Sequence, residues 1–129
     1  GRAEDREILQ AVCDRLGTGP EGIVPFAYNP KTDKAAIAKY CAIALELADR
    51  GNPAALNILR TGALELGSLV RAVQNRLNMP NCRIALLGGL LEPENPYRRM
   101  VAQELSGFGH VITPAQNALW GAAQLAWEL

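Results

Sequence analysis

Hydrophobic residues recur at helical spacing along most of the chain, and the longest such pattern follows Asn52 and Pro53. Asparagine suits an N-cap and proline suits the first helical turn, so a helix is expected to begin here and to end near Asn78. Its apolar positions lie three and four residues apart: they are Leu56, Leu59, Ala63, Leu66, Val70, Val73 and Leu77. We expect one long amphipathic helix, in which Gly62 and Gly67 mark either the close approach of a neighbour or no particular contact.

Shorter helical patterns occur on both sides of this helix. In chain order they cover residues 4–16, 20–28, 33–51, 95–107 and 117–128. The helix over residues 33–51 is predicted to cover a wide apolar arc, with Ile37 and Cys41 on one stripe and Tyr40, Ile43 and Leu47 on another. The last helix carries a face of small residues, which favours tight packing against a neighbour.

Two short apolar segments predict strands. Residues 84–87 form a continuous apolar run that ends at Gly88 and Gly89, which is typical of a buried strand in a parallel sheet. Residues 110–113 predict a second short strand. The chain is therefore expected to be α/β, helix-rich with a small, mostly parallel sheet. Because two strands alone have little stability in water, we expect further strands from the rest of a longer protein or from a second copy of the chain.

The glycine pair after the first strand is a candidate ligand site. A strand that ends in glycines and is followed by a helix, here at Asn95 and Pro96, is the kind of junction at which α/β proteins bind nucleotides. Gly88 and Gly89 have no side chains, so a ligand could lie directly on their backbone. The chain has neither a Walker-type phosphate loop nor a dinucleotide-binding fingerprint. The residues alone therefore leave the kind of ligand open.

Composition narrows the class of protein. The chain has 129 residues, of which 49% are hydrophobic, and its 13 basic and 13 acidic residues cancel. This predicts a single domain over residues 1–129 and disfavours nucleic acid and membrane as partners. Cys13, Cys41 and Cys82 lie in apolar patterns, which predicts reduced thiols in the core and therefore a cytoplasmic protein. Since Gly1 stands where methionine would begin a protein, the chain is expected to be a piece of a longer one.

Few side chains are candidates for catalysis. His110 is the only histidine, and at the start of a strand it is expected to be a solvated or capping residue. Glu92, Glu94 and Glu104 follow the glycine pair, and we interpret them as solvated charge, with a catalytic acid or base among them as the less favoured alternative. These residue types do not predict a nucleophile with its base.

Aromatic and arginine side chains near the two strands have structural and functional interpretations. Trp120 and Trp127 share one helical face, which favours a core or subunit contact over a platform that stacks on bases. Tyr97, Arg98 and Arg99 could reach a nucleotide from the start of their helix. An arginine pair on an amphipathic helix, however, is more often ordinary surface.

Four segments, in this order and spacing, resemble the C-terminal part of the BadF/BadG/BcrA/BcrD-type ATPase and N-acetylglucosamine kinase family. They are Gly51-Asn52-Pro53-Ala54-Ala55 leading to Ile58-Leu59, Leu69-Val70-Arg71-Ala72-Val73 with Leu77, residues 84–91, and residues 111–114 with 120–126. The opening residues 2–5 are also similar to what that family has just past its central strands. The resemblance implies a two-lobed, actin-like (ribonuclease H-like) ATPase fold, of which this chain would be a fragment of the second lobe.

The resemblance also implies a function. Gly88, Gly89 and Leu90 would bind the adenosine of ATP, and the stretch from Pro114 to Ala123 would form a connection between lobes. The phosphate-binding turns, the catalytic base and most of the hold on Mg²⁺ would lie outside the chain, so no residue here is expected to be catalytic. The parent would be an ATP-dependent kinase of N-acetylglucosamine or a related amino sugar, and the isolated chain would be inactive.

Two alternatives remain at this point. Another branch of the same family activates dehydratases or reductases through an iron–sulfur cluster that cysteines hold between subunits, and the apolar surroundings of Cys13, Cys41 and Cys82 favour the kinase over it. The second alternative is a non-enzymatic helical interaction domain that forms a homodimer. In that case Gly88 and Gly89 would be only a turn.

Overall fold

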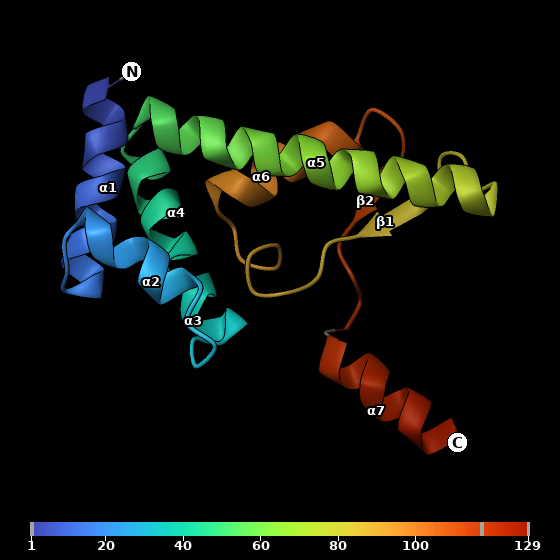
Figure 1. Ribbon diagram of the computed structural model, residues 1–129. Coiled ribbons are helices and arrows are strands. Elements are labelled where there is room, and N and C mark those ends of the chain that lie inside the picture. Colours follow the sequence, from blue (N-terminus) through green and yellow to red (C-terminus); the bar gives the residue numbers. More distant parts are fainter. Residues whose placement is uncertain (1, 117, 129) are drawn as a thin grey trace. The chain divides into compact units, whose positions relative to one another are not determined.

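A computed structural model describes residues 2–116 and 118–128, which form a helix-rich α/β fold (Figure 1). The elements are α1 (Arg2–Leu16), the 3-10 helix η1 (Pro20–Gly22), α2 (Ile23–Ala27), α3 (Lys34–Ala38), α4 (Cys41–Asp49), α5 (Pro53–Leu77), β1 (Arg83–Ala85), α6 (Pro96–Leu105), β2 (His110–Ile112) and α7 (Ala118–Glu128). The chain divides into two compact units, Gly1–Arg60 and Thr61–Leu129, and α5 contributes its first turns to one and the rest to the other.

The first unit is helical, and its buried apolar side chains come from three helices. They are Cys13 on α1, Ile43, Leu47 and Ala48 on α4, and Ala55 and Leu59 on the first turns of α5. α1 stops at Gly17, whose φ of 71° lies in the left-handed region that glycine adopts without strain. The predicted helices over residues 4–16 and 20–28 are both present, the second as η1 followed by α2.

The prediction of one helix over residues 33–51 is wrong. Asp33 caps α3 by accepting a hydrogen bond of 2.6 Å from the Ala36 amide, but the chain turns at Tyr40 before α4 begins. The Tyr40 amide bonds to the Ile37 carbonyl at 3.0 Å, a tight turn of the 3-10 type, and its ring meets Phe26 edge-on with centroids 5.4 Å apart. A contact with a residue of α2 therefore accompanies the break, and local sequence does not reveal it.

This break changes what the helix buries. Ile43 and Leu47 lie in the core as their stripe predicted, whereas Ile37 is 42% exposed and Cys41 is exposed at the first position of α4. Cys13 is buried and Cys82 is half-buried. The prediction that all three cysteines are core thiols is thus wrong for Cys41, which lies at the exposed start of α4, although Ala48, seven residues further along the same side of the helix, is buried.

In the second unit, β1 and β2 pair in parallel with α6 between them in the chain, which confirms the expected parallel sheet. The register pairs Arg83 with His110, Ile84 with Val111 and Ala85 with Ile112. Side chains alternate along a strand, so Ile84 and Val111 face the helices, whereas Arg83, Ala85 and His110 are exposed on the other side. The first strand was expected to be buried, whereas in the described chain Ile84 is half-buried and Arg83 and Ala85 are exposed.

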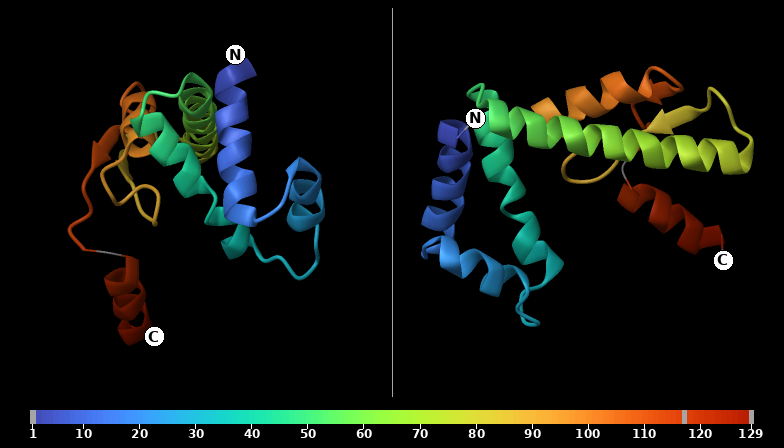
Figure 2. Two further views of the ribbon diagram at one scale, coloured as in Figure 1. Left: turned by 90° about the vertical axis from the view of Figure 1, so that its left-hand side faces the viewer. Right: turned by 45° about the horizontal axis from the view of Figure 1, so that its top comes forward.

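The core of the second unit lies between α5, α6 and the sheet (Figure 2). Val101 and Leu105 on α6 are 0% and 1% exposed, and they pack with Ala63 of α5 and with Leu86 just after β1. This burial is what holds the two strands against the helices.

The interior glycines of α5 lie where α6 comes close. A Cβ on Gly67 would lie 2.7 Å from Cγ of Glu104, and one on Gly62 would lie 3.3 Å from the ring of Tyr97. Of the two interpretations that the sequence left open, close approach of a neighbour is therefore correct. Glycine costs the helix roughly 1 kcal/mol relative to alanine at each position, and the contact with α6 compensates.

The last helix is present as α7 (Ala118–Glu128), while the predicted start at residue 117 lies outside the described residues. Its large apolar side chains are exposed: Leu119 by 78%, Trp120 by 57%, Leu125 by 66% and Trp127 by 91%. A Cβ on Gly121 would meet no atom within 4 Å. The expected tight packing of the small residues of α7 is therefore absent from the described part of the chain. Trp120 and Trp127 are both exposed, so neither is a core residue of the described chain.

Candidate functional site

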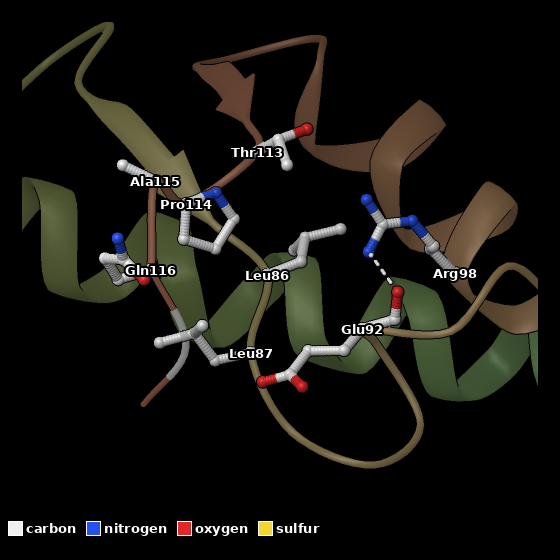
Figure 3. A pocket seen from close by; sticks show the side chains of 8 residues that line it. All are labelled: Leu86, Leu87, Glu92, Arg98, Thr113, Pro114, Ala115 and Gln116. Atoms are coloured by element: carbon white, nitrogen blue, oxygen red, sulfur yellow. Dashed lines mark hydrogen bonds between the residues drawn. The ribbon is translucent and has the colours of Figure 1, made fainter. Parts of the chain in front are cut away.

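A pocket of about 290 Å³ lies at the carboxyl end of both strands of the second unit (Figure 3). Its walls come from the segments that follow β1 and β2 and from the start of α6: they are Leu86, Leu87, Glu92, Arg98, Thr113, Pro114, Ala115 and Gln116. Because the strands run parallel, their carboxyl ends meet at one edge of the sheet. Open α/β sheets bind their ligands at that edge.

The loop between β1 and α6 folds back on Gly88. The Gly88 carbonyl accepts hydrogen bonds from the Leu91 and Glu92 amides, each at 2.9 Å, and the Gly88 amide donates to Oε1 of Glu92 at 3.1 Å. Gly88 has a φ of 100°, a backbone conformation that side chains strain. The turn therefore needs glycine at position 88, and it sets the Glu92 carboxylate at the pocket.

Asn95 fastens this loop to α6. Its Oδ1 accepts a hydrogen bond of 2.8 Å from the Arg98 amide, which caps the helix. Its Nδ2 donates to the carbonyls of Leu90 at 2.8 Å and Pro93 at 3.0 Å. One side chain thus fixes both the first turn of α6 and the loop that precedes it, as the N-cap signal at this position predicted.

Arg98 forms a wall of the pocket with its charge already engaged. Its guanidinium donates to the carbonyls of Leu91 and Glu92, the latter drawn as a dashed line in Figure 3, and it lies 3.7 Å from the Glu94 carboxylate. Arg99 also pairs with Glu94, at 2.7 Å, and does not line the pocket. Of the arginine pair, Arg98 is therefore at the site, and the exposed Arg99 is surface.

The residues predicted to bind nucleotide are close to the pocket in the chain but do not form its walls. Gly88, Gly89 and Leu90 lie between the lining residues Leu87 and Glu92, and all three are exposed. A Cβ on Gly89 would meet no atom within 4 Å. Open space beside the Gly89 backbone leaves room for a ligand there, whereas the described protein atoms do not require glycine at that position.

Sequence reasoning missed half of the pocket, the segment from Thr113 to Gln116. The signal was available, because residues after the second strand of a parallel pair must meet residues after the first. Thr113 contributes a hydroxyl, and Gln116 contributes an amide that can both donate and accept hydrogen bonds.

Of the candidate acids and bases, only Glu92 lines the pocket. Glu94 is held by Arg98 and Arg99, and Glu104 lies against α5 at Gly67. His110 is exposed at the amino end of β2, at the other end of the strand from the pocket. Among the described residues there is no group of three histidine, cysteine, aspartate or glutamate side chains that could hold a metal ion.

Comparisons of the chain with protein-family models, with curated proteins and with solved structures found no match. Within residues 2–116 and 118–128, no helix combines the length and the apolar character that crossing a membrane requires.

Proposed function

We propose that the second unit binds the adenosine part of ATP in the pocket at the carboxyl ends of β1 and β2. In this proposal the chain belongs to the second lobe of an actin-like, ATP-dependent kinase that acts on N-acetylglucosamine or a related amino sugar. The observation that supports it most is the position of the pocket, at the edge of two parallel strands and beside a glycine turn.

The chemistry of the walls suits a nucleoside. Leu86, Leu87 and Pro114 offer apolar surface to the faces of a base, and the Glu92 carboxylate can accept hydrogen bonds from ribose hydroxyls beyond the one it takes from Gly88. The charge of Arg98 is engaged by two carbonyls and by Glu94, so this side chain has little left for a phosphate. A volume of about 290 Å³ fits a nucleoside better than a whole nucleoside triphosphate.

The kinase reaction would need groups that this site does not offer. Phosphoryl transfer depends on metal ions that hold the phosphates and on a residue that positions the acceptor hydroxyl. In the proposal, these groups and the sugar pocket come from the rest of a longer protein, as the family resemblance implies.

The choice between kinase and dehydratase activator rests on fewer residues than the sequence suggested. Burial of Cys13 still favours the kinase, because a cluster ligand must be accessible at a subunit edge. Cys41 is exposed and no longer contributes to that argument.

The proposal is tested by titrating the chain with adenosine and with ATP in a calorimeter. Both should bind with a Kd on the order of 1 mM and within about threefold of each other, because the phosphates have no partner in this site. Gly89→Val should abolish binding without lowering the melting temperature, since its side chain enters space that protein atoms leave open. Gly121→Val, at a glycine on α7 that is equally unhindered, is the matched control.

Two outcomes would contradict the adenosine proposal. One is no heat of binding from either compound up to about 10 mM, and the other is equal affinity in the Gly89→Val and Gly121→Val variants. Turnover of ATP by the chain alone at a rate typical of kinases, about 1 to 100 per second, would show that catalytic groups lie within it.

A non-enzymatic interaction domain remains a second candidate because of α7. Four large apolar side chains of this helix are exposed, which is the surface that a homodimer would cover. Sedimentation velocity distinguishes the two. If the chain dimerises, Trp127→Gln restores the monomer and adenosine does not bind, the interaction domain is the better description.

A further inference from the structure

A second pocket, of about 320 Å³, lies where α5 ends and the chain turns into β1. It is at the amino end of β1, whereas the proposed adenosine pocket is at the carboxyl end. The residues that give it its character are Arg71, Gln74, Asn75, Asn78, Asn81 and Phe108. The lining thus holds one cation and four amides but no carboxylate, which favours a ligand that carries negative charge.

The side-chain oxygen of Gln74 accepts no hydrogen bond from the described residues. The residue is 7% exposed, and its Nε2 donates to the Phe108 carbonyl at 3.0 Å and contacts Sγ of Cys82 at 3.3 Å. A carbonyl only accepts hydrogen bonds, so the side-chain nitrogen must point toward Phe108 and Oε1 must be the other atom. Among the described residues, none donates a hydrogen bond to this Oε1. A buried acceptor without a donor is unfavourable, and a ligand hydroxyl would satisfy it.

Arg71 is held in place with its donors available. Its guanidinium carbon lies over the Phe108 ring, 4.6 Å from the ring centroid, in a cation–π contact that uses no hydrogen bond. Among the described residues, none accepts a hydrogen bond from this guanidinium, so its N–H groups are available to a ligand. Within the described chain, the ion pairs are formed by other arginines, so the charge of Arg71 has no acidic partner.

Asn78 and Asn81 place two further amides on the turn at the pocket. Their φ values are 51° and 53°, in the left-handed region, which asparagine tolerates better than most residues with a side chain. Glycine would be easier still for the backbone. The side-chain amides therefore add hydrogen-bonding groups at positions where the fold itself would accept glycine.

We propose that this pocket binds a small hydroxylated anion, which could come from a polyol phosphate or from a hydroxy acid. Its phosphate or carboxylate pairs with Arg71, a hydroxyl donates to Oε1 of Gln74, and the amides of Asn78 and Asn81 complete the set of hydrogen bonds. The site is separate from the adenosine pocket, and it stands on residues that the proposed function does not use.

The test follows the side-chain amide signals of Gln74, Asn75, Asn78 and Asn81 by NMR during titration of the chain. Glycerophosphate and glycerate are the two probes, while methyl phosphate, propionate and glycerol each lack one of the two required features. At least one probe should shift the Gln74 signals and bind about tenfold more tightly than any of the three partial compounds. Which probe does so identifies the source of the anion.

Substitutions tie the binding to the pocket. Arg71→Gln should weaken it about tenfold, whereas Arg76→Gln, which removes the same charge from the same helix outside the pocket, should change it less than about twofold. Asn78→Gly should also weaken binding while the melting temperature stays equal or rises, because glycine accepts the positive φ.

The proposal is overturned if neither probe shifts these amide signals up to about 10 mM. It is overturned as well if methyl phosphate or propionate binds as tightly as its hydroxylated counterpart, because the Gln74 acceptor would then have no role. Equal affinity in the Arg71→Gln and Arg76→Gln variants would likewise show that the anion responds to general charge and not to this pocket.

Discussion

α6 and α7 have nearly the same length, 10 and 11 residues, but they bury very different amounts of surface. On α6, Val101 and Leu105 are 0% and 1% exposed, although four of the ten residues of the helix are arginine, glutamine or glutamate. On α7, which carries one charged residue, Trp127 is 91% exposed. Hydrophobic content therefore does not decide burial here. α6 has a single apolar stripe and a neighbour whose glycines admit it, whereas the apolar side chains of α7 are spread around its axis.

The largest effect is expected where α6 fills the core. Leu105→Ala should lower the free energy of unfolding by about 3 kcal/mol, because it leaves a cavity among side chains that cannot fully collapse. The same substitution on α7, Leu125→Ala, should change it by less than about 0.5 kcal/mol. Urea denaturation followed by circular dichroism measures both. Similar losses in the two variants would mean that α7 is packed as well as α6.

An intermediate effect is expected at the cap of α6. Asn95→Ala should cost about 2 kcal/mol, since it removes both the cap on the Arg98 amide and the two bonds that Nδ2 makes to the loop. Asn95→Asp keeps the capping oxygen and loses only the loop bonds, so it should cost about half as much. If the two variants are equally stable in urea, the bonds to Leu90 and Pro93 contribute nothing.

The smallest effect on stability is expected from Trp127, where the informative quantity is accessibility. Trp127→Gln should change the free energy of unfolding by less than about 0.5 kcal/mol. Acrylamide should quench the fluorescence of Trp127 more strongly than that of Trp120, which is 57% exposed. Variants that keep only one of the two tryptophans measure each side chain separately. Quenching that falls as protein concentration rises would instead indicate that a second copy covers α7.

The elements that the sequence predicted well are those with local signals. Asn52 with Pro53 and Asn95 with Pro96 mark helix starts by groups that act within one turn, and both α5 and α6 begin where these pairs predict. The break before α4 accompanies a contact between Tyr40 and Phe26, which no local pattern encodes. Exposure of α7 likewise depends on which neighbours are present and not on the helix itself.

Within the candidate site, too, residues with a local sequence signal differ in predictability from residues that only tertiary contacts bring together. The turn at Gly88 was predictable, because a glycine after a strand is a local feature and its φ of 100° requires that residue. The walls formed by Thr113 and Pro114 have no local signal and could be predicted only from the pairing of β1 with β2, which brings them beside the residues after β1. The second pocket was missed for a related reason: the Gln74 acceptor becomes meaningful only when its nitrogen is known to bond to Phe108.

The parallel register of β1 and β2 also governs the order in which the second unit folds. Pairing of Arg83 with His110 closes a loop that contains all of α6. The chain entropy lost in closing this loop must be met before any hydrogen bond forms between the strands. Because both pockets depend on segments that flank the paired strands, each forms only after this loop has closed. A ligand in either one would therefore slow global unfolding and protect the His110 amide, which bonds to the Cys82 carbonyl at 3.0 Å, from hydrogen exchange.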